Sequence, residues 1–375
     1  MFEVNFGEAI LVEEENNRLV IDCGAKFGGK GVLAAGKVLP NLGKSQNKLL
    51  ISHFDEDHYN GVREMVGKVK FDKIYLPLYI YEDKKKAVLQ TLEVFNDTIK
   101  VWCYLKLIGM GSKLDELQKL FVNIPLLVNS PRDISCVGKG DNIKLSSKQF
   151  DILWPEKNMK IGKSGYSDEI RILLEDYQAE LQSINSLVDT YTSVFSNIYM
   201  YYAVRESDQD IDLLMVELEE TYARLESSVL NIELEDDDKK RINSISSTMI
   251  RNMNECSVVA HDKKELLLLG DISKRIYEKK IEAQVSAEYK VVKIAHHGTK
   301  AYFCGSIPKA KKYLVSNSGV YRINWSIYEE YEKRYFAFMN CTNTYNPRCK
   351  STYRRCRSCK IGATDGSICI DTSKI

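Results

Sequence analysis

Two imidazoles and three carboxylates lie within six residues of each other in the run His53-Phe54-Asp55-Glu56-Asp57-His58, directly after an apolar stretch typical of a strand. Alternating positions at a strand end or in a tight loop point their side chains the same way, so His53, Asp55 and Asp57 are expected to converge. His58 turns the other way, towards a second ion. Imidazole and carboxylate groups are common ligands of divalent metals. The run therefore predicts a metal site; the alternative is a structural cluster, which would have to bury or solvate five charge-capable groups side by side.

Other polar residues stand where apolar runs end. A run of four leucines is followed by Gly270-Asp271, and the next apolar run is followed by His296-His297-Gly298. An earlier apolar run, Leu19-Val20-Ile21, ends at Asp22. Because a rigid strand end holds a ligand more accurately than a loop does, these side chains are candidates for the same site.

Within the segment 161–249, the spacing of apolar residues changes from two to between three and four from about Ser167 to Ile232. From Leu174 to Tyr202 this spacing predicts one helix near ten turns long, and after a break at Ser207-Asp208 a second helix begins at Ile211. The segment is expected to form a long antiparallel helical hairpin. Its apolar seams either pack only on each other, or they also serve dimerisation or docking of a protein partner through the end at residues 199–202.

The composition is that of a globular protein. The chain has 375 residues, 44% apolar and 28% charged, which allows one large domain or two. A net charge of +1 provides no global field for nucleic acid or an anionic membrane. The N-terminus lacks the pattern of an export signal, and no apolar stretch approaches the roughly 20 residues of a membrane span. The protein is expected to be cytoplasmic, with no membrane partner.

In their order along the chain, these motifs resemble those of the metallo-β-lactamase fold. The narrower resemblance is to the branch that contains the soluble domain of the DNA-uptake competence channel and bacterial phosphorylcholine esterases. It rests on Gly7-Glu8-Ala9-Ile10, Leu153-Trp154-Pro155, Asn254-x-x-Ser257-x-Val259 and Ser316-Asn317-Ser318-Gly319. The resemblance implies an α/β fold, an αββα sandwich formed by residues 1–160 and 250–340, with residues 161–249 as a helical insertion.

Carried over residue by residue, the resemblance implies a site for two ions. His53 and Asp55 would bind one ion, and Asp57, His58 and His297 (or His296) the other, with Asp271 bridging them. Zn²⁺ is expected, with Mn²⁺ or Fe as alternatives. Asp55 stands where the family has a histidine, Asn254 and Ser257 occupy the region of its third histidine motif, and its later Gly-His-Pro motif has no counterpart. Asp22, Asn254 and Ser257 are expected to support the ligands.

Such a pair of ions can hold a bridging hydroxide, which predicts a metal-dependent hydrolase. The resemblance favours a phosphodiesterase or nuclease acting on a nucleic acid or nucleotide, with Asp57, Asp271 and His296 as catalytic residues. Whichever of His296 and His297 is not a ligand orients the substrate, protonates the leaving oxygen, or plays a structural part. One alternative is a hydrolase of lactones, esters or β-lactams, and another is a non-catalytic partner-binding module.

The tail, residues 341–375, is rich in cysteines and basic residues. One Cys-x-x-Cys motif and two preceding cysteines predict a structural Zn²⁺ held by Cys341, Cys349, Cys356 and Cys359. Free thiols or a disulfide are the alternatives. The surrounding lysines, arginines and tyrosines either contact nucleic acid or decorate a solvated knuckle. The residues up to Asp371 are expected to form a closing strand.

Overall fold

The computed structural model describes residues 1–2, 4, 7–26, 31–43, 46–83, 88–157, 159, 162–177, 182–204, 210–299, 302, 304–316, 338–341 and 369–374. The chain divides into two compact units, one made of Met1–Pro77, Asn123–Glu156 and Asn254–Ile375, the other of Leu78–Val122 and Lys157–Met253. The sequence analysis places residues 78–122 in the hydrolase domain, whereas in the structure they group with the helices of the second unit.

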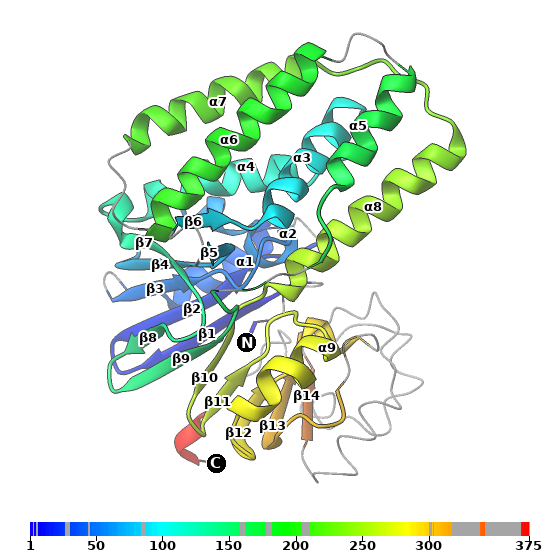
Figure 1. Cartoon of the computed structure of the whole chain (residues 1–375). Helices are drawn as coiled ribbons and strands as arrows, with labels where there is room; N and C mark the ends of the chain where they lie inside the picture. Colours follow the sequence, from blue (N-terminus) through cyan, green and yellow to red (C-terminus); the bar gives the residue numbers. More distant parts are fainter. Residues whose placement is uncertain are drawn as a thin grey trace. The chain divides into compact units, whose positions relative to one another are not determined.

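The first unit contains two mixed sheets (Figure 1). One sheet has the order β1 (Ala9–Glu14), β2 (Asn17–Cys23), β3 (Asn47–Leu50), β4 (Lys73–Pro77) and β7 (Ile134–Val137). The other has the order β14 (Phe338–Cys341), β13 (Lys309–Val315), β12 (Glu288–Lys293), β11 (Leu266–Leu268), β10 (Val259–Asp262), β9 (Lys148–Trp154) and β8 (Asn142–Leu145). β2, β3, β4 and β7 are parallel to one another, and so are β11 to β14.

Alternate residues of the two sheets meet in one core. Leu19 and Ile21 of β2 join Phe150 and Ile152 of β9 in the same buried cluster, because residues two apart on a strand share a face. The opposite face of the first sheet contacts helix α1 (Gly31–Val38), and helical turns that follow α9 (Lys274–Ile276) contact β9. This unit is therefore an αββα sandwich, the fold class that the sequence predicts.

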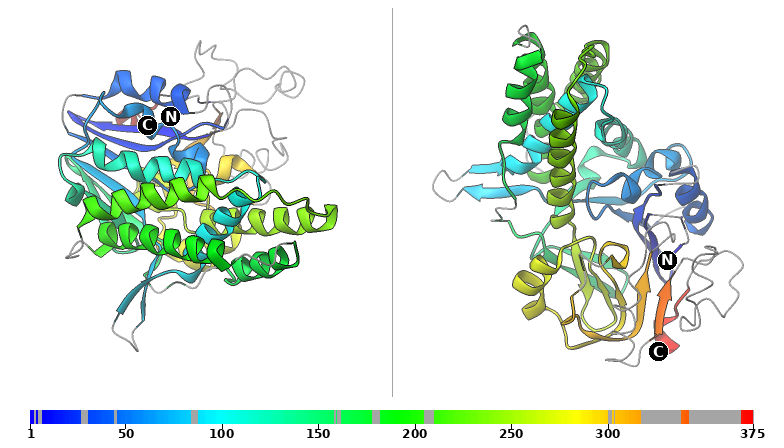
Figure 2. Two further views of the ribbon diagram at one scale, coloured as in Figure 1. Left: turned by 90° about the horizontal axis from the view of Figure 1, so that it is seen from above. Right: turned by 90° about the vertical axis from the view of Figure 1, so that its right-hand side faces the viewer.

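The second unit is mostly helical. It contains the hairpin of β5 (Ile80–Asp83) and β6 (Val88–Thr91) and the helices α3 (Glu93–Leu107), α4 (Leu114–Asn123), α5 (Tyr166–Tyr177), α6 (Gln182–Val204), α7 (Ile211–Ser227) and α8 (Asp236–Glu255). Helices α6 and α7 lie side by side (Figure 2). Within the described part of the chain, none of the helices combines the length and the apolar character needed to cross a membrane.

The expected ten-turn helix is wrong, because the structure has two helices, α5 and α6, over that stretch. Both contact α3, so the apolar spacing continues through the break and does not reveal it. The rings of Phe95 and Tyr199 pack 4.8 Å apart between α3 and α6. Tyr199 and Tyr202 are fully buried in this unit. Their burial favours the packing interpretation of the seam over docking through these two side chains.

The described part of the tail is short. Residues 369–371 are coil and are followed by a single turn at Thr372–Lys374, while residues 365–368 of the predicted closing strand lie outside the described residues. Ile370 packs against the sandwich core, and the Thr372 carbonyl accepts a hydrogen bond from Lys290 Nζ at 2.8 Å. This end of the chain therefore contacts the core as a coil, without pairing to a strand. Cys349, Cys356 and Cys359 lie outside the described residues, as does the side chain of Cys341, so the structural zinc and the nucleic-acid contact of the tail stay predictions.

Candidate metal centre

Several predicted site residues lie at or after the carboxyl ends of parallel strands in both sheets of the first unit. Asp22 belongs to β2, and His53 follows β3. Asp271 follows β11, and His297 follows β12. Since parallel strands end at the same edge of a sheet, residues more than 200 positions apart in the sequence gather at one place.

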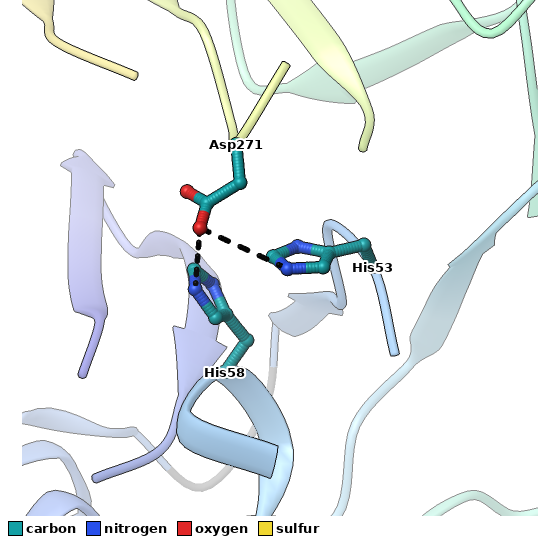
Figure 3. Close-up of side chains that lie close together, drawn as sticks. All are labelled: His53, His58 and Asp271. Carbon is teal, nitrogen blue, oxygen red and sulfur yellow. Dashed lines mark ion pairs between the residues drawn. The ribbon is translucent and has the colours of Figure 1, made fainter. Parts of the chain in front are cut away.

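Five of the predicted ligands form two overlapping groups. The first consists of His53, His58 and Asp271, and the second of Asp57, His58 and His297. Figure 3 shows the rings of His53 and His58 facing one Asp271 oxygen, Oδ2, at 3.9 Å and 3.4 Å from their Nε2 atoms. His297 Nε2 lies 3.4 Å from Asp57 Oδ2 and 3.9 Å from Asp271 Oδ2. All five side chains are buried.

Two ring nitrogens in these groups fit a metal ion. The Nε2 atoms of His53 and His58 are buried, and neither has a hydrogen-bond partner among the described groups. A buried polar atom without a partner is costly, and native structures contain few of them. Because both atoms face the Asp271 carboxylate, a divalent cation between them would use the nitrogen lone pairs and neutralise the carboxylates. The residues present therefore fit a divalent metal.

Asp55 is not in either group. It is the N-cap of the short helix α2 (Glu56–Tyr59), and its Oδ1 accepts a hydrogen bond from the backbone N–H of Glu56 at 2.9 Å. Short polar side chains are favoured at this position because they satisfy a free backbone donor of the first turn. The structure therefore does not bring Asp55 into either ligand group, and its binding of an ion beside His53 stays a prediction.

Asp22 holds two parts of the metal motif in place. Its Oδ1 accepts from the Ser52 backbone N–H at 2.7 Å, and its Oδ2 accepts from the Ser52 hydroxyl at 2.7 Å. The same Oδ2 lies 2.8 Å from His58 Nδ1. Ser52 Oγ in turn lies 3.0 Å from His53 Nδ1. Hydrogen bonds to Nδ1 orient each ring and leave Nε2 for a metal.

The two neighbouring histidines have different surroundings. His297 is buried, and its Nδ1 donates to the Ser316 carbonyl at 2.9 Å, which leaves Nε2 directed at the carboxylates. The His296 side chain is 22% exposed, its Nδ1 lies 2.9 Å from Asp271 Oδ2, and its ring stacks on Tyr302 at 3.8 Å. His297 is thus the candidate ligand of the pair, and His296 the candidate contact to substrate. Both have a positive φ, 45° and 54°, which non-glycine residues rarely adopt.

Burial and neighbouring charges shift the titration of these groups when no metal is present. Burial, together with the charge of His58, lowers the pKa of His53 to about 4. Burial disfavours charged His58 as well, but Asp271 and Asp22 outweigh it and raise the pKa of His58 well above its usual range. For Asp271, burial is likewise outweighed, and His58 and His296 hold the pKa of that carboxyl well below its usual range. The metal-free centre therefore contains a neutral His53 beside a charged pair of His58 and Asp271.

The remaining predicted residues border this centre or lie apart from it. Asn254 Nδ2 is 3.3 Å from His296 Nδ1, while Asn254 Oδ1 and the Ser257 hydroxyl are buried with no hydrogen-bond partner among the described groups. His261 is half-buried, and its Nδ1 lies 2.7 Å from the Tyr289 hydroxyl, so it belongs to neither ligand group.

A buried ion pair next to the site was not among the predicted site residues. Lys293 of β12 is fully buried and pairs with Glu8, whose Oε2 also accepts from the Ser316 hydroxyl at 3.0 Å. Burial opposes the charge on Lys293, but Glu8 and Asp271 raise its pKa. The signal in the sequence was a lysine within the apolar run Val291-Val292-Lys293-Ile294, because a charged residue inside such a strand needs a partner.

Comparisons with known proteins give one partial similarity. None of the family models compared with the chain matches it. The chain is 30% identical over 99 residues to ribonuclease J of Mycoplasma genitalium (strain ATCC 33530 / DSM 19775 / NCTC 10195 / G37), covering 23% of this chain and 17% of that protein. The chain therefore spans about a sixth of the length of the relative it matches. This similarity agrees with a hydrolase on the predicted fold, whereas the narrower branch resemblance stays a prediction.

Proposed function

We propose that this chain is a metal-dependent phosphodiesterase that cleaves RNA. The observation that carries the proposal is the buried group of imidazoles and carboxylates in which the Nε2 atoms of His53 and His58 face Asp271 and have no hydrogen-bond partner among the described residues. The similarity to a protein named ribonuclease J supports RNA as the substrate class. Zn²⁺ is the expected ion, with Mn²⁺ or Fe as alternatives, because the donors are nitrogen and oxygen atoms.

The residues that would hold the metal are the members of the two groups: His53, Asp57, His58, His297 and Asp271. A bound divalent ion would supply a water of lowered pKa and would neutralise charge on a phosphoryl oxygen. The chain itself orients these donors: Asp22 holds His58 through Nδ1, and the Ser316 carbonyl holds His297 in the same way.

His296 is the group of this site placed to move a proton. Its Nδ1 is bound to Asp271, so Nε2 is the ring atom left for a substrate, and stacking on Tyr302 holds the plane of the ring. In this proposal His296 gives a proton to the oxygen that leaves when the phosphodiester breaks. General acid catalysis of this kind contributes about 10²- to 10⁴-fold to the rate.

The test is cleavage of end-labelled single-stranded RNA by the metal-loaded protein and by three variants. Asp271→Ala is expected to lose both bound metal and cleavage, because it removes the carboxylate that four imidazoles face. His296→Gln is expected to keep its metal and to lose about 10²- to 10⁴-fold in rate. His261→Gln is the matched control, since this histidine lies in a hairpin and bonds only to Tyr289 among the described groups.

Metal-loaded wild type that leaves RNA intact would refute the proposal. Single- and double-stranded DNA, a lactone and an aryl ester are tested in parallel. Hydrolysis of the lactone or ester without cleavage of nucleic acid would support the alternative hydrolase. Full cleavage by Asp271→Ala would point to a contaminating nuclease and would equally refute the assignment.

A further inference from the structure

His58 belongs to both ligand groups but has a single nitrogen to give. Its Nδ1 lies 2.8 Å from Asp22 Oδ2 and is committed to that buried carboxylate. Only Nε2 faces the centre, 3.4 Å from Asp271 Oδ2. A ring nitrogen has one lone pair and binds one ion. The two groups therefore compete for the same atom and cannot both be complete.

One of the two positions has a full set of donors. It is formed by Asp57, His58 and His297, with His297 Nε2 3.4 Å from Asp57 Oδ2. Asp271 Oδ2 borders it as a fourth donor, 3.4 Å from His58 Nε2 and 3.9 Å from His297 Nε2. His297 is oriented for it through the Ser316 carbonyl. Four protein donors exceed the three that catalytic zinc sites commonly use.

The other position is poor in donors. If His58 Nε2 binds the ion beside Asp57 and His297, the position beside His53 keeps two protein donors: His53 Nε2 and an oxygen of Asp271. Asp271 Oδ2 already lies 2.9 Å from His296 Nδ1, and Oδ1 accepts from the His296 backbone N–H at 3.2 Å. Asp55 caps α2, and no further histidine, cysteine or acidic residue of the described chain joins His53 there. Two protein donors fall short of the usual three.

We propose that this centre binds one divalent ion per chain, held by Asp57, His58, His297 and Asp271, and that His53 is not required to hold it. This replaces the two-ion site that the resemblance implies. His53 then presents its free Nε2 to whatever occupies the second position, a substrate oxygen or a water. The inference rests on the metal binding in the proposed function but on no particular substrate.

Manganese is the probe that tests this stoichiometry. Mn²⁺ prefers nitrogen and oxygen donors, so the ten cysteines of the chain, which favour zinc, do not add to the count. Full-length protein is stripped with a chelator and titrated with Mn²⁺ by calorimetry, and electron paramagnetic resonance is recorded at saturation. We expect about one ion per chain and the spectrum of an isolated ion; two ions about 3.5–4 Å apart would couple magnetically.

Variants locate the ion. His297→Ala and Asp57→Asn are each expected to weaken Mn²⁺ binding by more than about 100-fold, since even a residue that only supports a ligand is worth about 10- to 100-fold. His53→Ala is expected to keep one ion with an affinity within about tenfold of wild type. Asp55→Ala removes the carboxylate that caps α2 and is also expected to keep the ion. It serves as a control for the loss of an acidic side chain beside the site. Circular dichroism of the stripped proteins establishes that each variant is folded.

Two coupled ions in the wild type, or loss of the ion in His53→Ala with retention in both His297→Ala and Asp57→Asn, would overturn the inference. RNA cleavage is measured separately on the same preparations. A protein that holds one ion and leaves RNA intact refutes the proposed function alone, whereas one that cleaves RNA with a coupled pair refutes this inference alone.

Discussion

Replacement of Asp22 provides the most quantitative test of how the centre is built. Its buried carboxylate receives three contacts, from the Ser52 N–H and hydroxyl at 2.7 Å each and from His58 Nδ1 at 2.8 Å. Removing one partner of a buried charge pair costs about 3–5 kcal/mol. Asp22 also has φ = 58°, where alanine costs about 1–2 kcal/mol. Asp22→Ala is therefore expected to lose about 4–7 kcal/mol, comparable with the whole stability of many domains, about 5–15 kcal/mol.

Asp22→Asn separates the energetic cost of the left-handed backbone conformation from the cost of losing the negative charge. Asparagine tolerates the left-handed conformation, and its oxygen can still accept from the Ser52 N–H. Its amide nitrogen takes the place of Oδ2 and can accept from neither His58 Nδ1 nor the Ser52 hydroxyl. The expected loss is therefore at least that of one hydrogen bond to a charged group, about 1.5–3 kcal/mol. The affinity for Mn²⁺ should fall by about 10- to 100-fold, because His58 loses the group that orients it.

Hydrogen exchange of residues 52–59, followed by mass spectrometry on protein stripped of metal with a chelator, measures the local stability. This measurement does not assume that the two units unfold in a single transition. Calorimetric titration with Mn²⁺ gives the affinity. Asp72→Asn is the control, since Asp72 is exposed and its removal changes the net charge equally. If Asp22→Asn matches this control in both exchange and affinity, the carboxylate does not hold His58 for the metal and the reasoning fails.

Three further predictions concern groups around the centre. Because the pKa of His58 is raised well above its usual range, a metal must displace its proton, so affinity should rise with pH by up to about tenfold per unit; affinity that rises as pH falls would contradict this. Lys293→Met leaves Glu8 buried without its partner and should cost about 3–5 kcal/mol in denaturant unfolding, part of which the added Glu8→Gln change restores. Equal stability of the single and double variants would argue against a paired charge. Gly24→Ala should unfold the sandwich or abolish metal binding, because a Cβ there lies 2.3 Å from backbone of the metal motif. Gly36→Ala in α1 meets nothing within 4 Å and should stabilise by about 0.5–1 kcal/mol; thermal unfolding of the two variants compares them directly.

The elements around the centre could be predicted because their signals are local. Alternating or continuous apolar runs mark β2, β9 and β12, and the polar residues that follow such runs mark the ends where ligands gather. The ligand types of the metal motif also follow from the sequence, since imidazole and carboxylate so close together have few other uses. The helical spacing marked α6 and α7 for the same reason.

Other features depend on contacts between distant residues. The apolar spacing that predicted one long helix arises because those residues pack against α3. Two successive helices that both contact α3 give the same apolar spacing as one long helix. Asp55 has the type and position of a ligand, but in the folded chain its Oδ1 accepts from the Glu56 N–H and caps α2.

By itself, the sequence determined which residues have the chemistry of metal ligands and that His53, Asp271 and His297 follow apolar runs typical of strands, because strand periodicity and residue chemistry are properties of neighbouring positions. Their meeting at one site of a sandwich was what the resemblance implied. Only the tertiary structure decided which atoms are free. His58 loses one nitrogen to Asp22, 36 positions away, and Asp271 is engaged by His296, 25 positions away. Those contacts form when both sheets pack, since a buried polar group must take whichever partner the fold brings within reach.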